Sequence, residues 1–437
     1  MRSKLTFYIF ISFTFVCAFF ASRYSRESFS WPGIVLYVFM WSGAALFLTY
    51  RYRTYLENIR TVIFVFAALS LLFLFRPYLL SDDVERYVWE GHVQNLGFNP
   101  YAAAPNDPQF ADEVLNKKVN HPQMTAIYPP FMQLTFRFLA FIQPSVQFFK
   151  IFFFLVSVFF VYFLWKQRDF FHDGYIIAGI FPFLAVETSW SGHLEVLAIL
   201  FLAAAVVYMK KKKYLLSGLF LGLSGMSKLI PALLVVYFVK ELYLQHKENP
   251  GSPENKNIRN GILFTAGFAA PFFLYAPYLW VGGYLISSLA IYSNQWVFGS
   301  FFYSLLGFTG MGNAYIRIFC ILALGIAGLL ILFKGKSLNL NIFYFMLSLS
   351  VFSPVVHPWY LLWLIPFSGK EFFNTSIAFL AASFLMYEVL ADLFAKNIWD
   401  GNRFIPLFYT VALSVFFMEF LKMKRTVRIQ NTDEFNR

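Results

Sequence analysis

The residues with the clearest chemical potential lie in one short segment, residues 82–90 (DDVERYVWE). If a helix begins here, Asp83, Tyr87 and Glu90 share one face, because residues three or four apart are neighbours on a helix. Two carboxylates held together and partly shielded from water raise the pKa of one of them toward neutrality. Such a carboxylate can act as a general base toward a hydroxyl group, which contributes about 10²–10⁴-fold to a rate.

A structural interpretation of the same acids is the alternative. Ser81 or Asp82 could cap the helix, and Asp82 with Glu85 has the spacing of a capping box. Acidic residues also favour the first turn of a helix through its dipole. Capping accounts for one carboxylate and leaves the other unexplained.

Further candidates lie in or beside apolar segments. Lys228 interrupts an apolar stretch, and a charge inside a membrane is functional by default, although a long side chain can instead reach the interface. His193 and Glu195 follow a Trp-Ser-Gly sequence, and His357 lies between two prolines. A single histidine is more often structural, and no His/Glu pair here has the spacing of a zinc site. Tyr128 could stack on a sugar ring, but Tyr and Trp belts occur at every membrane interface.

The composition places these residues in a membrane protein. The 437-residue chain is 59% hydrophobic, 22% aromatic and only 13% charged, whereas a soluble protein needs roughly a quarter of its residues charged. The net charge of +12 does not indicate nucleic-acid binding, because Lys and Arg cluster in short loops between apolar runs, as expected for cytoplasmic loops. Cys17 and Cys320 lie in apolar runs and indicate neither a disulfide nor a metal site. The predicted fold is an all-α, polytopic transmembrane helical bundle.

The lengths of the apolar runs predict the individual spans. A membrane-crossing helix needs about 20 apolar residues, with about 17–25 as the working range. A run at 174–188 is shorter, and the stretches 214–239 and 340–368 are too long for one crossing. The first span is expected to be a retained helix, because Phe19 and Phe20 do not fit a signal-peptide cleavage site. The clear spans are 5–22, 32–50, 61–79, 145–165, 193–209, 260–280, 315–333, 372–391 and 404–421.

The charges that flank the two long stretches set the topology. Basic residues lie on both sides of each stretch, so each is expected to cross an even number of times. Gly218, Gly222, Gly225 and Pro231 are the expected break in one stretch, and residues 353–358 in the other. This arrangement gives about fourteen passages with both termini in the cytoplasm.

The domain organisation follows from this topology. Residues 1–421 are expected to form a single multi-span domain with a large outer loop at about 79–144, and residues 422–437 a basic cytoplasmic tail. Within the loop, the segment 131–142 is too short to span and is expected to lie along the interface.

Several stretches together resemble a known group of enzymes. Residues 82–91 followed by 97–101 (GFNPY) are similar to the first outer loop of the bacterial polyprenol-phosphate-mannose-dependent α-1,6-mannosyltransferases and of glycosyltransferase family 87, and more distantly to GPI mannosyltransferase I. The resemblance covers about residues 76–370, with its pieces in the expected order. The other matching pieces are 127–130 (IYPP), 192–195 (GHLE) with 228–231 (KLIP), and 357–363 (HPWYLLW).

The resemblance implies a GT-C fold and an inverting glycosyltransferase that uses a lipid-phosphate sugar, typically mannose. It gives the role of base to Asp83 or to its neighbour Asp82. A sugar on polyprenyl phosphate already carries a good leaving group, so no general acid is needed, but cations must stabilise the departing phosphate. Substrate contacts are expected from Lys228, His193, Glu195, His357, Arg86, Tyr87, Glu90 and Tyr128.

The expected partners are a polyprenyl-phosphate sugar donor, a glycan or glycolipid acceptor and membrane lipid, without nucleic acid. No cofactor is expected, and a lipid monophosphate donor does not demand a divalent metal. The expected location is a bacterial inner membrane, with the active site on the periplasmic or extracellular side. Glu85, Glu90 and His92 depart from the Tyr, Asp and Arg common in the family, which leaves the sugar and the acceptor open.

Two other classes of protein are the alternatives. A secondary transporter or lipid flippase would suit the broken helices, but it keeps its working charges near the midplane and has short loops on both sides. A non-catalytic subunit of an envelope-assembly complex has no need of the clustered acids. The gathering of charges at one end, beside the large loop, favours an enzyme.

Overall fold

The computed structural model describes residues 2–247, 254–335, 337–399 and 403–435. Within these ranges the chain is all-helical, with 77% helix and no β-strand. An isolated parallel bridge joins Phe298 to Val355. The predicted all-α polytopic bundle is therefore confirmed.

Among the described residues, 7 helical segments are long and apolar enough to cross a membrane, and each coincides with a predicted span. Large apolar side chains such as Ile321 and Phe333 are exposed on them, as expected for surfaces that contact lipid. The chain is thus an integral, multi-pass membrane protein. The segments belong to α1 (Arg2–Ala21), α2 (Trp31–Arg51), α7 (Val146–Lys166), α14 (Glu254–Ala269) with η5 (Ala270–Val281), α17 (Asn313–Lys334), α19 (Phe373–Ala382) with η7 (Ser383–Glu388) and α20 (Val389–Lys396), and α21 (Ile405–Phe435).

Two predicted spans are shorter than expected. Helix α4 (Ile59–Leu74) ends before the predicted residue 79, because Pro77 disfavours a helical conformation at the residue before it and cannot continue the ladder. Helix α11 (Glu195–Lys210) begins two residues after the start of the predicted span 193–209. His193 therefore lies in the loop before α11 and not in the helix.

The stretch 214–239 is interrupted, but the glycines are not the interruption. Helix α12 (Tyr214–Ser227) contains all three, and the chain turns extended at Lys228 before η4 (Ile230–Leu234) and α13 (Val235–Lys247). A Cβ atom at Gly218 would lie 2.0 Å from the carbonyl oxygen of Phe264. Glycine here permits close packing of α12 on α14, so the prediction that it breaks the helix is wrong.

The stretch 340–368 is interrupted where predicted. Helix α18 (Leu338–Phe352) ends before Ser353, and the 3₁₀ helix η6 (Pro358–Leu364) follows the break. The bridge between Val355 and Phe298 ties this break to the segment before α16 (Phe301–Gly307). Whether the two interrupted stretches complete the predicted fourteen passages stays a prediction.

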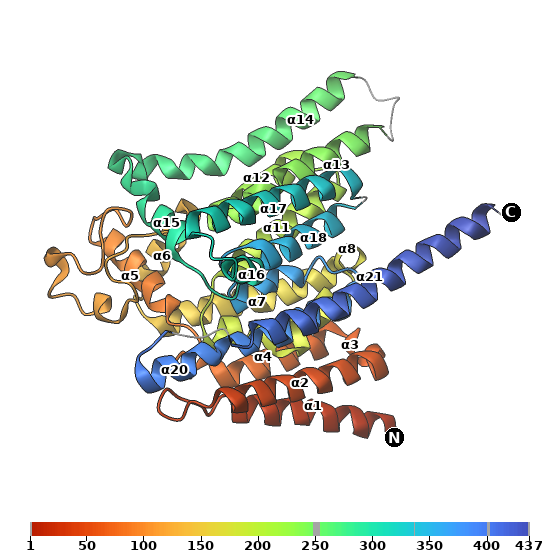
Figure 1. Ribbon diagram of the computed structural model, residues 1–437, viewed down its shortest axis with the longest axis horizontal. Coiled ribbons are helices and arrows are strands. Elements are labelled where there is room, and N and C mark those ends of the chain that lie inside the picture. The colour runs from red at the N-terminus through yellow and green to blue at the C-terminus, as the bar shows by residue number, and fades with distance from the viewer. Residues whose placement is uncertain (1, 248–253, 336, 400–402, 436–437) are drawn as a thin grey trace.

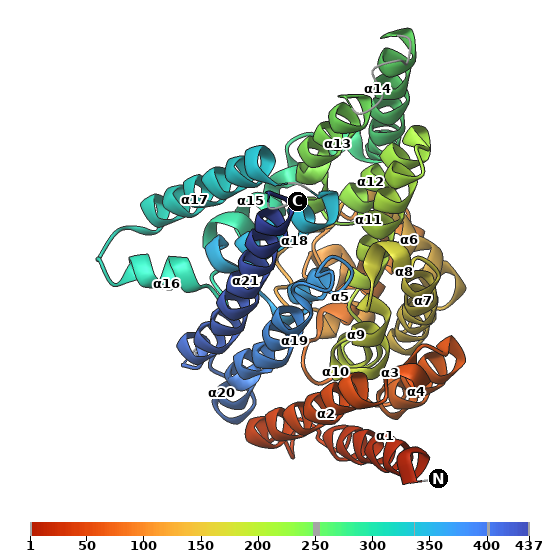
Figure 2. The ribbon, with the colours of Figure 1, turned by 90° about the vertical axis from the view of Figure 1, so that its right-hand side faces the viewer.

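The helices run between two ends of the bundle. The start of α1 and the end of α21 lie at one end, on the right in Figure 1. Helices α5 (Asp83–Asn95), α6 (Pro130–Ile142), α15 (Tyr284–Gln295) and α20 lie at the opposite end, which we call the α5 end. Figure 2 shows α11 inside the bundle, with α7 and α12 beside it.

The predicted outer loop at 79–144 is a folded layer at the α5 end. It contains α5, the 3₁₀ helices η1 (Pro108–Phe110) and η2 (Leu115–Lys118), and α6. One face of α6 packs on α5 through Met132 and Phe136, whereas Phe138 and Phe141 are exposed on its other face. This exposed apolar face suits the predicted position along the membrane interface. The remaining helices are α3 (Arg53–Leu56), α8 (Arg168–Phe171), α9 (Gly174–Ile180), α10 (Pro182–Leu184) and the π-helix η3 (Ala185–Trp190).

Candidate active site

At the start of α5, the acidic side chains bind other residues and do not cap the helix. Asp82 occupies the N-cap position, but its side chain makes no capping hydrogen bond. Its Oδ1 atom instead accepts a hydrogen bond from Nδ2 of Asn120 at 2.7 Å. Glu85 accepts a hydrogen bond from the Tyr78 hydroxyl at 3.0 Å. The capping-box interpretation is therefore wrong, although the helix begins where predicted.

The amide of Asn120 bridges the two aspartates. Its Nδ2 atom also lies 3.2 Å from Oδ1 of Asp83, so one side-chain amide holds both carboxylates. Desolvation, followed by the negative charge of Asp82, raises the pKa of Asp83 to about 7. Asp82 and Asp83 thus form an Asn120-bridged pair at the start of α5, and Glu90 does not belong to it.

Arg86 holds the loop that carries Asn120. Its guanidinium donates to the carbonyl oxygens of Asn120 and His121, the latter at 2.9 Å, and to that of Met124 at 3.1 Å. It also lies 3.7 Å from Oε1 of Glu90. These contacts give Arg86 a positioning role, and its predicted contact with substrate stays a prediction.

Glu90 lies between α5 and α6. It is buried, and its Oε2 atom accepts a hydrogen bond from Nε2 of Gln133 on α6 at 2.7 Å. Desolvation raises its pKa, and the charge of Arg86 opposes the shift. Glu90 thus joins α5 to α6, and its predicted substrate contact stays a prediction.

Tyr87 and Tyr128 face each other beside the aspartates. Their hydroxyl oxygens lie 3.2 Å apart, and the Tyr87 ring stacks on Phe136 with 4.8 Å between centroids. Desolvation, then the charges of Asp83 and Glu195, raise the pKa of Tyr128. The phenol therefore remains protonated and can donate a hydrogen bond, and it lies in the field of both carboxylates.

Gly192 brings the start of α11 against the start of α5. Its φ of +78° is a conformation that other residues rarely adopt, and a Cβ atom there would lie 3.0 Å from Cγ2 of Val84. This close approach explains why the charge of Glu195 contributes to the raised pKa of Asp83, after desolvation and Asp82. The predicted site residues at the start of α5 and those at the start of α11 thus belong to one cluster.

Lys228 turns into the protein at the end of α12. Its Nζ atom lies 2.5 Å from Oε1 of Glu195 and 3.7 Å from the centroid of the Tyr360 ring. The lysine side chain is 13% exposed and the glutamate side chain 1% exposed. The ammonium group is therefore bound inside the protein. The alternative, in which the side chain extends to the membrane interface, does not hold.

The two candidate histidines belong to one stack of rings. His193 stacks on Trp359 with centroids 3.8 Å apart, and Trp359 stacks on His357 at 4.4 Å. His193 is fully buried and its ring nitrogens have no hydrogen-bond partner. Its nearest acidic atoms are Oε2 of Glu187 at 3.7 Å and Oε2 of Glu195 at 4.0 Å. The stack attaches η6 to the loop before α11.

Two further polar residues of this cluster were not predicted. Glu187 lies in the π-helix η3 and accepts a hydrogen bond from the Tyr387 hydroxyl at 2.7 Å. A glutamate inside the apolar run 174–188 was an available signal, because membrane-embedded acids are rarely without function. Tyr387 carried no such signal, since tyrosine is common in apolar helices.

Side chains from α7 and η3 hold the segment that leads from α4 into the site. Nζ of Lys150 donates to the carbonyl oxygen of Arg76 at 2.6 Å, and Nε1 of Trp190 donates to that of Pro77 at 2.9 Å. Gln147 donates to the carbonyl oxygen of Leu74 at 3.1 Å. These contacts fix the end of α4 and the connection that follows it.

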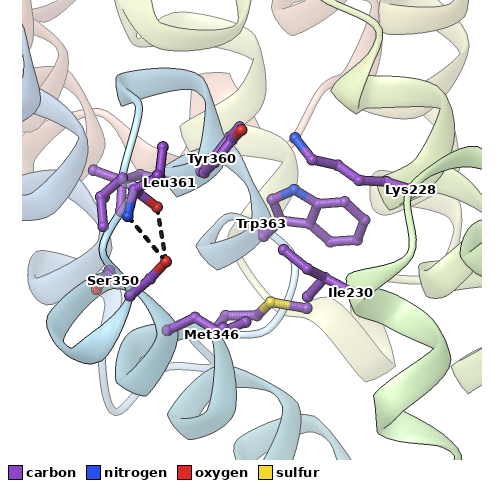
Figure 3. A pocket seen from close by; sticks show the side chains of 11 residues that line it. Lys228, Ile230, Met346, Ser350, Tyr360, Leu361 and Trp363 are labelled. Atoms are coloured by element: carbon purple, nitrogen blue, oxygen red, sulfur yellow. Dashed lines mark hydrogen bonds between the residues drawn. The ribbon is translucent and has the colours of Figure 1, made fainter. Parts of the chain in front are cut away.

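A cleft opens beside Lys228, with about 410 Å³ of empty volume, part of it open to the surroundings. Figure 3 shows Lys228 and Ile230 on one side of it, with Tyr360 and Met346 across from them. Apolar side chains form most of its wall. The lining residues are Lys228, Ile230, Met346, Leu349, Ser350, Ser353, Val355, Val356, Tyr360, Leu361 and Trp363.

The cluster contains a carboxylate with a raised pKa and a lysine that is paired with a glutamate. Asp83 has a pKa near neutrality, which suits proton abstraction at physiological pH. Lys228 supplies a positive charge that is paired with Glu195, and its Nζ atom lies 3.7 Å from the centroid of the Tyr360 ring. Among the described residues, no group of three or more His, Cys, Asp or Glu side chains is placed to hold a metal ion.

Comparison with known proteins gives the family. A model of glycosyltransferase family 87 matches residues 126–358, more than half of the chain. No curated protein and no solved structure matches. The match includes Tyr128, His193, Glu195, Lys228 and His357, whereas the two aspartates precede it. The chain belongs to glycosyltransferase family 87, a family of GT-C type glycosyltransferases.

Proposed function

We propose that this glycosyltransferase transfers a hexose, typically mannose, from a polyprenyl-phosphate donor to a hydroxyl group of an envelope glycan or lipid-linked acceptor, with inversion. The observation that carries the proposal is the Asn120-bridged pair of Asp82 and Asp83, in which Asp83 has a pKa of about 7. A carboxylate with this pKa accepts a proton from a hydroxyl group more readily than an ordinary aspartate.

The reaction is a single displacement. Asp83 accepts the proton of the acceptor hydroxyl as its oxygen forms a bond to the anomeric carbon. The bond between that carbon and the phosphate oxygen breaks on the opposite face, and the electron pair leaves with the phosphate. One displacement of this kind inverts the anomeric configuration. Lys228 and Tyr128 stabilise the charge that develops on the departing phosphate.

The charges at the two ends of the bundle support an outer-facing site. Arg51, Arg53, Arg60, Lys166 and Arg168 lie at or beside the ends of α2, α4 and α7 that are remote from α5. The positive-inside rule assigns these ends to the cytoplasm. The α5 end then faces the periplasm or the cell exterior, as in a bacterial inner membrane.

The transport alternative has a direct test in Asp83→Asn. A flippase has no need of a base at this position and tolerates the change, whereas the transferase loses nearly all turnover. Asp112→Asn is a matched control, because Asp112 is an exposed acid of the same loop. Folding of each variant is checked by gel filtration and thermal unfolding.

The donor is tested with purified protein in lipid nanodiscs. We expect transfer from polyprenyl-phosphate mannose and none from GDP-mannose when lipid-phosphate donors have been removed. Turnover of GDP-mannose under these conditions would overturn the donor assignment. Mass spectrometry of glycolipids from cells with and without the protein then identifies the sugar and the acceptor.

A further inference from the structure

Helix α15 packs on the loop that carries Asn120, at the α5 end of the bundle (Figure 1). In the middle of the helix, the hydroxyl oxygen of Ser288 accepts a hydrogen bond from the backbone N–H of Thr125 at 2.9 Å. Trp296 directly follows the last residue of the helix, and its ring lies edge-on to that of His121, with 4.8 Å between centroids. The end of α15 thus contacts the residue next to Asn120.

His121 has a backbone conformation that needs support. Its φ of +45° lies in the left-handed region, which residues other than glycine rarely adopt. Such a conformation persists only where the surrounding structure holds it. Arg86 donates to the carbonyl oxygen of His121 at 2.9 Å, and Trp296 packs on its ring. Because Asn120 directly precedes His121, these contacts also determine where the amide that bridges the two aspartates lies.

Trp296 is itself held from the start of α17. The guanidinium of Arg317 is buried, and it donates to the carbonyl oxygens of Ser293 at 2.5 Å and of Trp296 at 2.8 Å. Its Nε atom donates to Oδ1 of Asn313 at 2.8 Å, and Nδ2 of Asn313 donates to the carbonyl oxygen of Asn294 at 3.0 Å. A cation suits the C-terminal end of a helix, where carbonyl oxygens lack partners and the dipole is negative. We call Asn313 and Arg317 the α17 clamp.

The rest of α15 has other attachments. Besides the bond from Ser288 to the loop, the Tyr292 hydroxyl lies 3.0 Å from that of Tyr360. Desolvation raises the pKa of Tyr292 most, and the charges of Asp83 and Glu195 raise it further, so this part of the helix lies in the electric field of the site. What the α17 clamp adds is a fixed position for residues 293–296.

We propose that Arg317 and Trp296 are positioning residues for the proposed base, Asp83. Arg317 fixes the last turn of α15, Trp296 then holds His121, and the amide of Asn120 is thereby kept between the two carboxylates. The inference rests on the proposed function, because both residues act through Asp83. Neither residue needs to touch a substrate for this role.

The pH profile of transfer separates positioning from a general loss of structure. Desolvation and two neighbouring carboxylates raise the pKa of Asp83, whereas the hydrogen bond from Asn120 and a neighbouring guanidinium lower it. These charged groups are Asp82, Glu195 and Arg86. If Asn120 is displaced, the pKa of Asp83 rises, and the rise of kcat/KM moves to higher pH. Partial unfolding instead lowers kcat/KM at every pH and leaves the profile in place.

Two variants release the loop at different points. Arg317→Lys retains the charge but loses the planar fork that reaches two carbonyl oxygens, and Trp296→Ala removes the ring. In each we expect the profile to move to higher pH by about half a unit to one unit, the order expected for a weakened hydrogen bond to a carboxylate. An unshifted profile in either folded variant overturns the inference.

Conservative and matched variants complete this test. Trp296→Phe retains an aromatic ring against His121 and is expected to restore the wild-type profile. Arg23→Lys changes an exposed arginine of the loop between α1 and α2, and Trp280→Ala changes a tryptophan that is 75% exposed on η5. Both controls are expected to leave the profile unchanged.

The two residues are expected to act in series. Because Arg317 acts through Trp296, the double variant Trp296→Ala/Arg317→Lys should show no larger shift than Trp296→Ala alone. A shift equal to the sum of the two single shifts would show independent effects and contradict the proposal.

Hydrogen–deuterium exchange tests the contact without requiring turnover. In the full-length Arg317→Lys protein in nanodiscs, the amides of residues 117–126 are expected to exchange severalfold faster than in wild type, and those of α11 at the same rate. Unchanged exchange in residues 117–126 overturns the inference.

The outcomes also distinguish the positioning role from the reaction. Faster exchange in the variant, with no sugar transfer by the wild-type protein, contradicts the proposed function and leaves the α17 clamp. Normal transfer by wild type, with unchanged exchange and pH profiles in the variants, contradicts the positioning role and leaves the proposed function.

Discussion

Lys228 and Glu195 form an ion pair in which Nζ and Oε1 lie 2.5 Å apart, and only the lysine reaches the cleft. The two residues come from the end of α12 and the start of α11. Removal of one partner of a buried pair costs about 3–5 kcal/mol, because the remaining charge is left without compensation. Replacement of both partners is far better tolerated.

The pair therefore allows stability to be separated from donor binding. Lys228→Met is expected to lower the melting temperature and to raise the KM for the lipid donor at least tenfold. Adding Glu195→Gln should restore most of the melting temperature but not the KM, because the cation proposed to bind the phosphate is still missing. Recovery of the KM in the double variant would contradict a role for Lys228 in donor binding.

The pH dependence of the reaction follows from Asp83. Since the proposed base must be deprotonated, kcat/KM is expected to rise with pH through about 7, the pKa of Asp83. Asp82→Asn removes a negative charge that raises this pKa, so the rise should move to lower pH. Asn120→Ala removes a hydrogen bond that lowers the pKa, so the rise should move to higher pH. Shifts in the same direction would contradict this assignment.

Asp83→Asn should separate activity from stability. The loss of the proposed general base is expected to reduce kcat by about 10²–10⁴-fold. The pKa of Asp83 is raised in the folded protein, so its favourable contribution to stability is complete only below about pH 4 and is lost as pH rises through about 7. The variant should therefore melt at a higher temperature than wild type at pH 8 and not at pH 4. A lower melting temperature at pH 8 would contradict the desolvation of this charge.

The role of Arg86 is tested by proteolysis. Arg86→Lys retains the charge but loses the planar fork that holds three carbonyl oxygens. We expect faster cleavage by trypsin at the exposed Lys117 and Lys118, a lower kcat and an unchanged KM for the donor. Arg137→Lys, at an exposed position on α6, is the control. A raised KM with normal resistance to trypsin would indicate that Arg86 contacts substrate directly.

Close packing of α5 on α6 makes a prediction about Gly91. A Cβ atom there would lie 2.2 Å from the carbonyl oxygen of Phe136, whereas one at Gly43 meets nothing within 4 Å. Gly91→Ala is expected to lower the yield of folded protein severalfold, and Gly43→Ala to leave it unchanged. Fluorescence-detected gel filtration of tagged variants measures both.

Much of the architecture was predictable, because spans and helix starts are local properties. The length of an apolar run decides whether it can cross a bilayer, and the confirmed spans follow from it. The start of α5 and the break before η6 are also marked by nearby residues. The end of α4 and the glycines of α12 were misjudged, because hydropathy alone does not show where a backbone stops or what packs against it.

The site was predictable only in part, because its geometry joins distant segments. Asp83, Lys228 and Glu195 were recognisable as charges beside apolar runs. Asn120 was not, since an asparagine in a polar loop has no distinguishing pattern and its importance arises from the fold of residues 96–129 over α5. Lys150 was a missed charge in an apolar run, and that signal was available.

Lys150, Gln147 and Trp190 donate hydrogen bonds to carbonyl oxygens of residues 74–77 and so hold the connection between α4 and α5 in place. If Asp83 is the base, as proposed, this connection sets the position that the acceptor's nucleophilic oxygen must reach. Under the proposed function we therefore expect the regiochemistry to depend on the distance between the acceptor's reactive group and its own membrane anchor.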